Sequence, residues 1–271
     1  MDISIVIPVF NQLYFTKISL ESLQKTIPDD VKIIVIDNGS TDGTGEYLAT
    51  LHGVRVMRNS DNLGCACAWN QGVNTTQSEW VVISNNDVIV SPGWLEGLLS
   101  FAEEVGADVV SPAIREGEYN YDIVQYSKDF IERMACVSRI GVAQGVCFMV
   151  RRYVFERIGL FDENFKIGQF EDADFFRRAK IAGFTLITTG RSFIHHFSSI
   201  TQDSIRKDES MKPYESENRM YFRRKWKLTW WKRFLQRRYV KLRDSWWRLS
   251  ERSLYGHTLI EKWIDGRLRY F

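Results

Sequence analysis

Hydrophobic and polar positions alternate in blocks over residues 1–112. Runs rich in β-branched residues, such as 3–9 and 80–84, are typical of buried strands. Apolar residues at helical spacing separate these runs. The pattern predicts strands at 3–9, 32–36, 54–57, 80–84 and 107–111, and helices at 13–23, 41–51, 62–72 and 92–105. This order, with its short loops, predicts an α/β fold with a doubly wound, mostly parallel sheet whose strands end at one common edge.

The pattern changes after Pro112, where charges and tyrosines are mixed with few clear periods. We interpret residues 115–142 as a variable loop region near a substrate. The chain beyond them predicts a strand at 142–150, helices at 151–158 and 171–182, and a late pair of strands at 184–188 and 192–195. Residues 1–218 are therefore interpreted as one domain, whose two halves divide at residue 112.

The last part of the chain has a different composition. Residues 219–271 hold 16 Lys and Arg against 4 Asp and Glu, a net charge of +12, so residues 1–218 carry −10 of the overall +2. Six of the nine tryptophans lie in this tail. Apolar residues recur from Leu228 to Leu249 at spacings of 3 and 4, which predicts one stripe on a helix. A shorter stripe at 260–268 is interpreted as more of the same basic, amphipathic helical tail.

Three kinds of partner suit the tail. Its stripe can dock on the body of the protein or on a second copy in a homodimer. Equally, residues 226–271 can lie on an anionic membrane surface, with tryptophans at the interface and arginines among the headgroups. Basic residues interleaved with aromatic ones also suit nucleic acid, but this is the least favoured partner and none is expected.

Several other classes of protein are disfavoured. No apolar run reaches the ~18 residues that a membrane span needs, and the start of the chain lacks the basic segment of a signal peptide. The four cysteines form no Cys-x-x-Cys pair, so free thiols in a reducing cytoplasm are expected, with a Cys65–Cys67 metal site as a minor alternative. No glycine-rich dinucleotide loop follows the first strand, and no P-loop is present. We therefore expect a cytoplasmic protein that is peripheral to the membrane through its tail.

Polar side chains follow several of the predicted strands. Asn11, Asp37 and Asn62 lie just beyond three of them, and Asn85-Asn86-Asp87 comes directly after the strand at 80–84. An Asx-rich turn explains this last stretch when it is taken alone. Ligands of open α/β sheets, however, bind beyond the carboxyl ends of the strands. The whole set therefore indicates a polar ligand, such as a divalent cation that carries a diphosphate.

Two further clusters are candidates for a chemical role. Glu171, Asp172 and Asp174 crowd the start of a predicted helix. Interaction with the helix dipole explains one such acid, at about 0.3–1 kcal/mol each, but three together suggest a site in which a fixed carboxylate acts as a general base. His195 and His196 end a predicted strand in a chain with only four histidines. A single histidine is more often structural, whereas this pair suits a metal or phosphate contact.

Taken in order, these segments resemble the family 2 glycosyltransferases of the GT-A fold. Each motif is weak alone, but the ordered set is specific and covers about residues 3–200. The matching segments are Val6-Ile7-Pro8-Val9-Phe10-Asn11, Val35-Ile36-Asp37-Asn38-Gly39-Ser40-Thr41-Asp42-Gly43-Thr44, Asn62-Leu63-Gly64 with Asn70-Gln71-Gly72, Ser84-Asn85-Asn86-Asp87-Val88, Gly159-Leu160-Phe161-Asp162-Glu163, Glu171-Asp172-Ala173-Asp174 and His195-His196-Phe197-Ser198-Ser199. The resemblance implies an inverting hexosyl- or deoxyhexosyltransferase, with a nucleotide-sugar-binding half at 1–112 and an acceptor half at 113–218.

The resemblance also implies roles for individual residues. Asp172 would be the catalytic base, with Glu171 the next candidate. Asp87 would hold Mn²⁺ or Mg²⁺, with Asn85 and His196, or its neighbour His195, as further metal or diphosphate contacts. The nucleotide-sugar would be bound by Pro8, Val9, Asn11, Asp37, Asn38, Asn62, Gly64, Asn70, Asn85 and Asn86. Among these, Asp37 would accept the N3–H of a uracil or thymine base.

One residue departs from the family's pattern. Asn85 is neutral where the first Asp of the family's Asp-x-Asp motif is charged, which lowers the expected metal affinity. The expected donor is a UDP- or dTDP-sugar, and the expected acceptor is a hydroxyl of a glycan, lipid-linked or envelope molecule. A catalytically silent nucleotide-sugar-binding or scaffold protein is one alternative, which Glu171-Asp172 argue against. A nucleotidylyltransferase is another, but it would want a glycine-rich basic loop in place of Phe10-Asn11-Gln12-Leu13.

Overall fold

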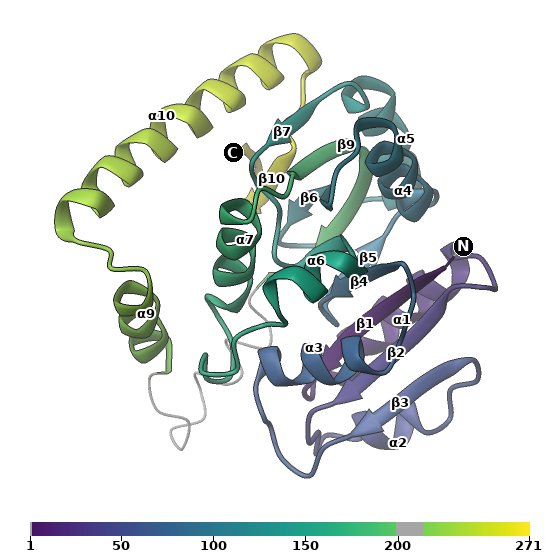
Figure 1. Ribbon diagram of the computed structural model, residues 1–271. Coiled ribbons are helices and arrows are strands. Elements are labelled where there is room, and N and C mark those ends of the chain that lie inside the picture. The colour runs from purple at the N-terminus through teal and green to yellow at the C-terminus, as the bar shows by residue number, and fades with distance from the viewer. Residues whose placement is uncertain (1, 199–213) are drawn as a thin grey trace.

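A computed structural model describes residues 2–198 and 214–271, so Ser199 of the predicted His-x-x-Ser segment lies outside the described residues. One β-sheet runs through the body between helices, and a long helix extends along one side (Figure 1). The strands are β1 (Ile3–Val9), β2 (Lys32–Asp37), β3 (Val54–Arg58), β4 (Trp80–Ser84), β5 (Val88–Val90), β6 (Val109–Glu116), β7 (Ser138–Ile140), β8 (Cys147–Arg151), β9 (Leu186–His196), β10 (Ile260–Ile264) and β11 (Arg267–Tyr270). The helices are α1 (Leu13–Thr26), α2 (Thr44–Leu48), α3 (Cys65–Asn74), α4 (Trp94–Val105), α5 (Ile123–Met134), α6 (Arg152–Ile158), α7 (Glu171–Ile181), α9 (Tyr214–Lys225) and α10 (Trp230–Tyr255).

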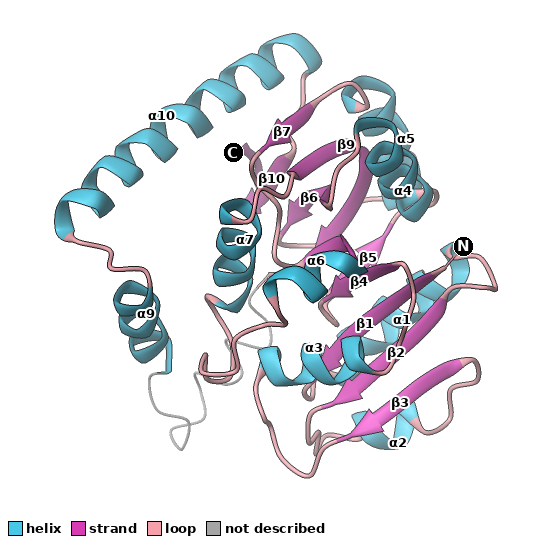
Figure 2. Ribbon diagram, viewed as in Figure 1, coloured by secondary structure: helices cyan, strands magenta, loops and turns pink. Residues whose placement is uncertain are grey.

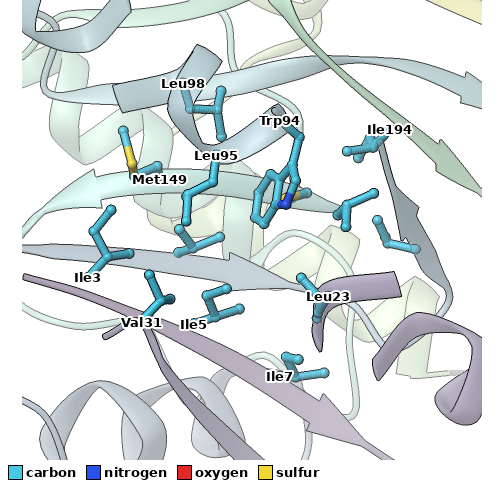
Figure 3. Packing of buried hydrophobic residues seen from close by; sticks show 14 of the residues in the cluster. Ile3, Ile5, Ile7, Leu23, Val31, Trp94, Leu95, Leu98, Met149 and Ile194 are labelled. Carbon is cyan, nitrogen blue, oxygen red and sulfur yellow. The ribbon is translucent and has the colours of Figure 1, made fainter. Parts of the chain in front are cut away.

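The first half is a parallel sheet covered on both faces. Its strands pair in the order β4-β1-β2-β3. Ile5 and Ile7 of β1 pack with Trp94 and other residues on one face (Figure 3), whereas Val6 packs with Trp69 of α3 on the other. Because both faces are buried there, β1, β2 and β4 are mostly apolar, which is the pattern that predicted them. The edge strand β3 instead carries the exposed Arg55 and Arg58.

The second half extends this sheet with strands of both directions. β8 pairs antiparallel with β4 and with β6, while β6 and β9 are parallel. The register of β6 and β9 shifts between Pro112 and Ala113, where proline has no N–H to donate. The predicted α/β fold is therefore confirmed, and its parallel pairing is found in β1–β4, between β6 and β9, and between β6 and β10.

The interpretation of residues 115–142 as a loop was wrong. They contain the end of β6, the whole of α5 and β7. Asp122 caps α5 by accepting two backbone N–H groups in its first turn, and Ile123, Ser127 and Phe130 are buried on one face. This face is hard to see in the sequence because it is narrow, because a serine occupies one of its positions and because charged residues surround it.

The late pair of predicted strands is one continuous strand, β9. Gly190 suggests a break between two strands, but it has another role. A Cβ at this position would overlap the carbonyl oxygen of Met134 at the end of α5. The glycine therefore lets the backbone of β9 pass close to α5.

The prediction of a helical stripe at 260–268 was also wrong. Residues Ile260–Ile264 and Arg267–Tyr270 form the β10–β11 hairpin, and Asp265 and Gly266 connect them with φ values of 51° and 68°. Two positive φ values at an Asp-Gly pair are typical of the type I′ hairpin turn. β10 pairs in parallel with β6, so the end of the chain joins the main sheet (Figure 2).

Candidate functional site

A cavity of about 560 Å³ opens where β1 and β4 end. This carboxyl edge is where α/β sheets bind their ligands. The predicted site residues that line it are Pro8, Val9, Asn38, Asn62, Asn85, Asn86, Asp87, Glu171, Asp172 and His196. The predicted site residues outside the lining are Asn11, Asp37, Gly64, Asn70 and His195. The fold thus brings the candidate metal ligands and the candidate base together from segments far apart in the sequence.

Asp87 and His196 meet through the pairing of two short strand segments. Asp87 precedes β5 and His196 ends β9, and these strands pair antiparallel with Val88 opposite His196. Asp87 Oδ1 lies 3.4 Å from His196 Nε2, and Glu116 Oε1 lies 3.4 Å from His196 Nδ1. Both Asp87 and His196 are buried. The imidazole is therefore held between two carboxylates.

These charges shift one another's protonation. Burial disfavours a charged His196, but Asp87 and Glu116 outweigh burial and raise its pKa to about 9. Burial likewise opposes the charge of Glu116, yet His196 and Lys262 lower its pKa to about 2. Asp87 Oδ1 is buried, and its contact with His196 is a long ion pair rather than a well-formed hydrogen bond. Since a buried carboxylate oxygen without a close hydrogen bond costs free energy, this atom is suited to a further cationic ligand.

The residues at this site fit a divalent cation that substrate phosphates help to hold. Asp87 offers its buried carboxylate, and Asn85 offers an amide oxygen from the same lining. Across residues 2–198 and 214–271, no group of three or more His, Cys, Asp or Glu side chains is placed to hold a metal by itself. Mg²⁺ is typically bound by one or two carboxylates together with phosphates, so a partial set of protein ligands is expected. His196 would have to lose its proton to act as a ligand.

His195 lies on the opposite face of β9 from His196. Its Nδ1 is 3.1 Å from the hydroxyl of Tyr121, and its ring packs against Tyr119 with centroids 5.0 Å apart. Burial, aided by the positive charges of His196 and Arg115, lowers the pKa of His195 to about 3. Successive side chains of a strand point to opposite faces. The histidine pair therefore gives one residue at the cavity and one in an aromatic cluster.

The candidate base lies at the first turn of α7. Ile167, Gln169 and Phe170 have positive φ values of 58°, 77° and 76°, and this tight loop delivers the chain to Glu171. Burial and then the charge of Asp172 raise the pKa of Glu171, and burial also raises the pKa of Asp172. Glu171 is buried, whereas Asp172 is partly exposed within the cavity lining. A reachable carboxylate with a raised pKa is a better proton acceptor.

Gly145 supports the candidate base and was missed as a site residue. A Cβ at this position would overlap the carboxylate of Asp172. Gly145 and Val146 line the cavity, and the Asn85 N–H donates to the Val146 carbonyl at 2.9 Å. The short segment of Gly145 and Val146, just before β8, therefore contacts both Asp172 and Asn85. The available signal was a glycine inside the strand predicted at 142–150, which often marks a close approach.

Asn218 of α9 holds the loop that leads into α7. Its Nδ2 donates to the carbonyl oxygens of Lys166 and Gly168, each at 2.8 Å, and its Oδ1 accepts the Lys166 N–H at 2.9 Å. Trp226 Nε1, just after α9, donates to Asp174 at 2.9 Å. Asp174 is therefore a structural acid rather than a cavity residue. The start of the predicted tail is thus part of the support of the site.

A network of amides shapes the opposite wall. Asn38 Nδ2 donates to Asn62 Oδ1 at 2.8 Å, and Asn59 Nδ2 donates to Asn38 Oδ1 at 2.9 Å. Asn62 Oδ1 also accepts the Gly64 N–H at 3.0 Å. Gly64 has a φ of 89°, and a Cβ there would lie 3.0 Å from the backbone nitrogen of Ile167. The network therefore fixes the end of β2, the start of α3 and their approach to the loop before α7.

Asp37 and Asn11 lie behind the cavity lining. Asp37 is fully buried, and its Oδ1 accepts the Ser40 N–H at 2.9 Å. Its Oδ2 has no hydrogen-bond partner and lies 3.3 Å from Nε of Arg58. Asn11 has a φ of 56°, and its Oδ1 accepts the Thr41 N–H at 2.8 Å. Asn11 therefore ties the turn after β1 to the turn after β2, while Asp37 is paired with Arg58 behind the lining.

Asn70 and Asn86 use their amides within the protein. Asn70 Nδ2 donates to the carbonyl of Phe161 at 2.9 Å, and Asn70 Oδ1 accepts the Phe161 N–H at 2.9 Å. Asn86 Nδ2 donates to Thr16 Oγ1 at 2.9 Å.

Cys65 lines the cavity, and burial together with Glu171 raises its pKa well above the usual value. A raised pKa disfavours the thiolate that the alternative Cys-x-Cys metal site would need.

Comparison with known proteins agrees with this geometry. The family described as Glycosyl transferase family 2 matches residues 4–159. GlyG, a glycosyltransferase of Streptococcus pneumoniae, is 32% identical over 124 residues, which cover 44% of this chain and 40% of GlyG. The N-acetylglucosaminyl-diphospho-decaprenol L-rhamnosyltransferase of Mycobacterium tuberculosis is 26% identical over 216 residues, with 65% and 70% covered. The chain spans less than two thirds of the length of several curated relatives that it matches.

Solved structures share the fold. TarS of Staphylococcus aureus (residues 1–349, with UDP) has a TM-score of 0.58 at 18% identity, covering 76% of this chain and 64% of TarS. The mannosyltransferase PcManGT of Pyrobaculum calidifontis, with GDP-Man and Mn²⁺, has a TM-score of 0.58 at 18% identity, with 76% and 60% covered. The fold and its carboxylate-lined cavity define a protein of the GT-A type. The chain belongs to glycosyl transferase family 2, which confirms the resemblance seen in the sequence.

Proposed function

We propose that this chain is an inverting glycosyltransferase that moves a hexose or deoxyhexose from a nucleoside-diphosphate sugar to an acceptor hydroxyl. The observation that supports it most is that Asp87 and Asp172 line the same cavity at the carboxyl edge of the sheet. Asp87 suits the diphosphate side of the reaction, and Asp172 suits the acceptor side. The placement of the Asp172 carboxylate in the same lining as Asp87 favours a catalyst over a catalytically silent binding protein.

The proposed donor carries uracil or thymine, as in UDP or dTDP. Asp37 Oδ2 is buried and paired with Arg58 at 3.3 Å without a hydrogen bond, and it is proposed to accept the N3–H of these bases. Pro8 and Val9 line the cavity beside it, and Asn11 fixes the adjoining turn. Of the remaining donor-binding residues expected from the sequence, Asn38, Asn62, Asn85 and Asn86 line the cavity and stay in the proposal, whereas Gly64 and Asn70 lie behind the lining. TarS, which has the same fold, is known with UDP.

The proposed cofactor is Mn²⁺ or Mg²⁺. Asp87 would hold the ion, with the Asn85 amide oxygen as a second contact and His196 on the ion or on the diphosphate. When bound, the ion neutralises charge that develops on the leaving diphosphate. PcManGT and GalNAc-T7, which share the fold, were solved with Mn²⁺. Asn85 is neutral, so the ion is expected to bind more weakly without donor than at a pair of carboxylates.

Asp172 performs the proposed proton transfer. Its carboxylate removes the proton of the acceptor hydroxyl as the oxygen attacks the anomeric carbon of the donor. The bond between that carbon and the diphosphate oxygen breaks on the opposite side, and the electron pair leaves with the diphosphate. The configuration of the anomeric carbon is therefore inverted. Glu171 is the second candidate, but its burial and its raised pKa favour a neutral carboxyl beside Asp172.

The proposed acceptor is a glycan, lipid-linked or envelope molecule, met at the cytoplasmic side of a membrane. The mycobacterial relative acts on a diphospho-decaprenol carrier according to its name. The basic, aromatic tail of this chain suits the same setting.

A panel of nucleotide sugars tests the proposal. The full chain is incubated with UDP- and dTDP-sugars and Mn²⁺ or Mg²⁺, and the release of free nucleoside diphosphate is measured with and without a lipid-linked acceptor. We expect metal-dependent turnover of at least one donor, which EDTA abolishes. Donor binding without any turnover would instead support the catalytically silent alternative. No binding of any donor would contradict both.

A further inference from the structure

The outer face of α10 is apolar and exposed along its whole length. The helix has 26 residues, which corresponds to about 39 Å. Its stripe residues recur every three or four positions, and each exposes between 64% and 72% of its surface. These residues are Trp231, Leu235, Tyr239, Leu242, Trp246 and Leu249, and we call them the α10 stripe. In Figure 1, α10 projects along the side of the body. An apolar row of this extent on a surface helix marks an interaction site.

The opposite face of α10 makes the contact with the body. Glu251 is buried and receives two hydrogen bonds from the guanidinium of Arg139, at 2.7 and 2.8 Å. Glu251 also accepts the Leu259 N–H at 2.9 Å, and Arg139 lies 5.0 Å from the ring of Trp247. Docking on the protein's own body therefore uses the face that carries Glu251 and leaves the α10 stripe uncovered.

The charge around the stripe has one sign. From Asn218 to Arg243 the chain holds eleven Lys and Arg residues and no Asp or Glu. On the helical wheel Lys232 and Arg238 lie beside the α10 stripe, whereas Arg233 and Arg237 fall on the face that carries Glu251. Within the part of the chain that the structure describes, neither Lys232 nor Arg238 forms an ion pair. Cations at the edge of an apolar stripe are suited to an external anionic surface.

We propose that the α10 stripe lies on an anionic membrane surface. The apolar side chains enter the interfacial region, and the flanking Lys and Arg residues contact the headgroups. In residues 2–198 and 214–271 no helix has the length and apolar character to cross a bilayer, so these helices allow contact along the surface only. A second copy is less suited, because packing two α10 stripes together would bring two basic rows side by side.

This contact would also set the position of the cavity. Trp226 and Asn218, which lead into α10, are hydrogen-bonded to α7 and to the loop before it. A docked α10 therefore holds the opening of the cavity near the membrane surface, where a lipid-linked acceptor would be met. The membrane contact itself does not depend on sugar transfer, and it is measured without donor or acceptor.

Vesicle co-sedimentation of the full chain tests the proposal. Vesicles of phosphatidylcholine alone are compared with vesicles that also contain phosphatidylglycerol, at low and high salt. We expect at least about tenfold tighter binding to the anionic vesicles, weakened by salt. A stripe variant (Leu235→Gln, Leu242→Gln, Trp246→Gln) should abolish binding, and a charge variant (Lys232→Glu, Arg238→Glu) should lower it by about tenfold or more.

Matched variants and the oligomeric state complete the test. Ile140→Gln with Ile181→Gln removes exposed apolar residues elsewhere, at 72% and 69% exposure, and should leave binding unchanged. Circular dichroism checks that every variant is folded. The proposal would be overturned if the chain bound both vesicle types equally. It would also be overturned if the Ile140→Gln, Ile181→Gln control lost as much binding as the stripe variant. A dimer, seen by light scattering, that dissociates in the stripe variant would overturn it too, because a second copy would then cover the stripe. Tighter binding to a DNA duplex than to anionic vesicles would overturn it as well.

Discussion

Asp87 Oδ1 lies 3.4 Å from His196 Nε2, although β4 and the end of β9 are far apart in the chain. The short strand β5 creates this contact because it pairs antiparallel with β9 immediately after Asp87. Glu116 holds the other nitrogen of the imidazole at 3.4 Å. The candidate metal site is thus assembled from both halves of the domain.

The charge at positions 85 and 87 should control metal use. Asn85→Asp adds the missing carboxylate, and we expect about tenfold tighter apparent binding of Mn²⁺. Asp87→Asn removes the buried charge and should lower turnover by about 100-fold or more. Both are measured as donor turnover over a range of Mn²⁺ concentrations. The exposed Asp61→Asn on a nearby loop is the control, and a loss there as large as in Asp87→Asn would show that the effect is not local.

Gly145→Ala should displace the candidate base. The added Cβ would overlap the Asp172 carboxylate, so we expect transfer to fall by about 100-fold, because small displacements of a catalytic group are costly. Donor affinity should stay within about twofold, since a misplaced base still leaves the donor contacts intact. Gly168→Ala is the matched control, because a Cβ there lies 3.8 Å from Glu171 and 3.9 Å from Cys65. Equal activity losses in both variants would refute the specific contact.

Much of the first half of this fold can be predicted from the sequence. Strands buried on both faces, such as β1 and β4, give apolar runs that need no tertiary information to recognise. Polar residues after those runs, such as Asn38 and Asp87, then point to the edge of the sheet where the cavity lies. The order of strands and helices is enough to place these residues together.

Contacts between distant elements could not be predicted in this way. Glu116 reaches His196 only because β6 and β9 pair in one register, and Asn218 reaches the loop before α7 only because α9 packs beside it. The hairpin after α10 was mistaken for a helix because four apolar residues fit helical spacing, while the Asp265-Gly266 turn was the better signal.

Glu171→Gln should stabilise the protein at neutral pH. Burial raises the pKa of Glu171 above its value in the unfolded chain. Between these two pKa values the folded state keeps a proton on Glu171 that the unfolded chain has lost. The free energy of unfolding therefore falls as pH rises from the unfolded pKa to the folded pKa. Removing the ionisable group removes this loss. We expect a gain of about 1–2 kcal/mol at pH 7 and little gain below the unfolded pKa, measured by urea unfolding. A loss of stability at pH 7 would contradict the assignment.

Asn218→Ala should weaken both stability and turnover. It removes the donor to the partly buried carbonyl groups of Lys166 and Gly168, at a cost of about 0.5–1.5 kcal/mol for each hydrogen bond. The loosened loop should lower kcat more than it raises KM for the donor. Glu217→Ala is the control, because its ion pair with Lys166 is exposed and should contribute only about 0–1 kcal/mol. The same stability and the same kcat in Asn218→Ala and Glu217→Ala would show that α9 does not position the loop.

Asp172→Asn tests the central claim most directly. The change removes the proton acceptor and keeps the size and place of the side chain. Transfer is measured with a turnover-competent donor and acceptor, and donor affinity is measured by calorimetry on the same preparation. We expect kcat to fall by about 1,000-fold or more, with donor affinity within about twofold of the unmodified chain. Unchanged transfer, or a loss of donor affinity as large as the loss of transfer, would contradict the role of Asp172 as the general base.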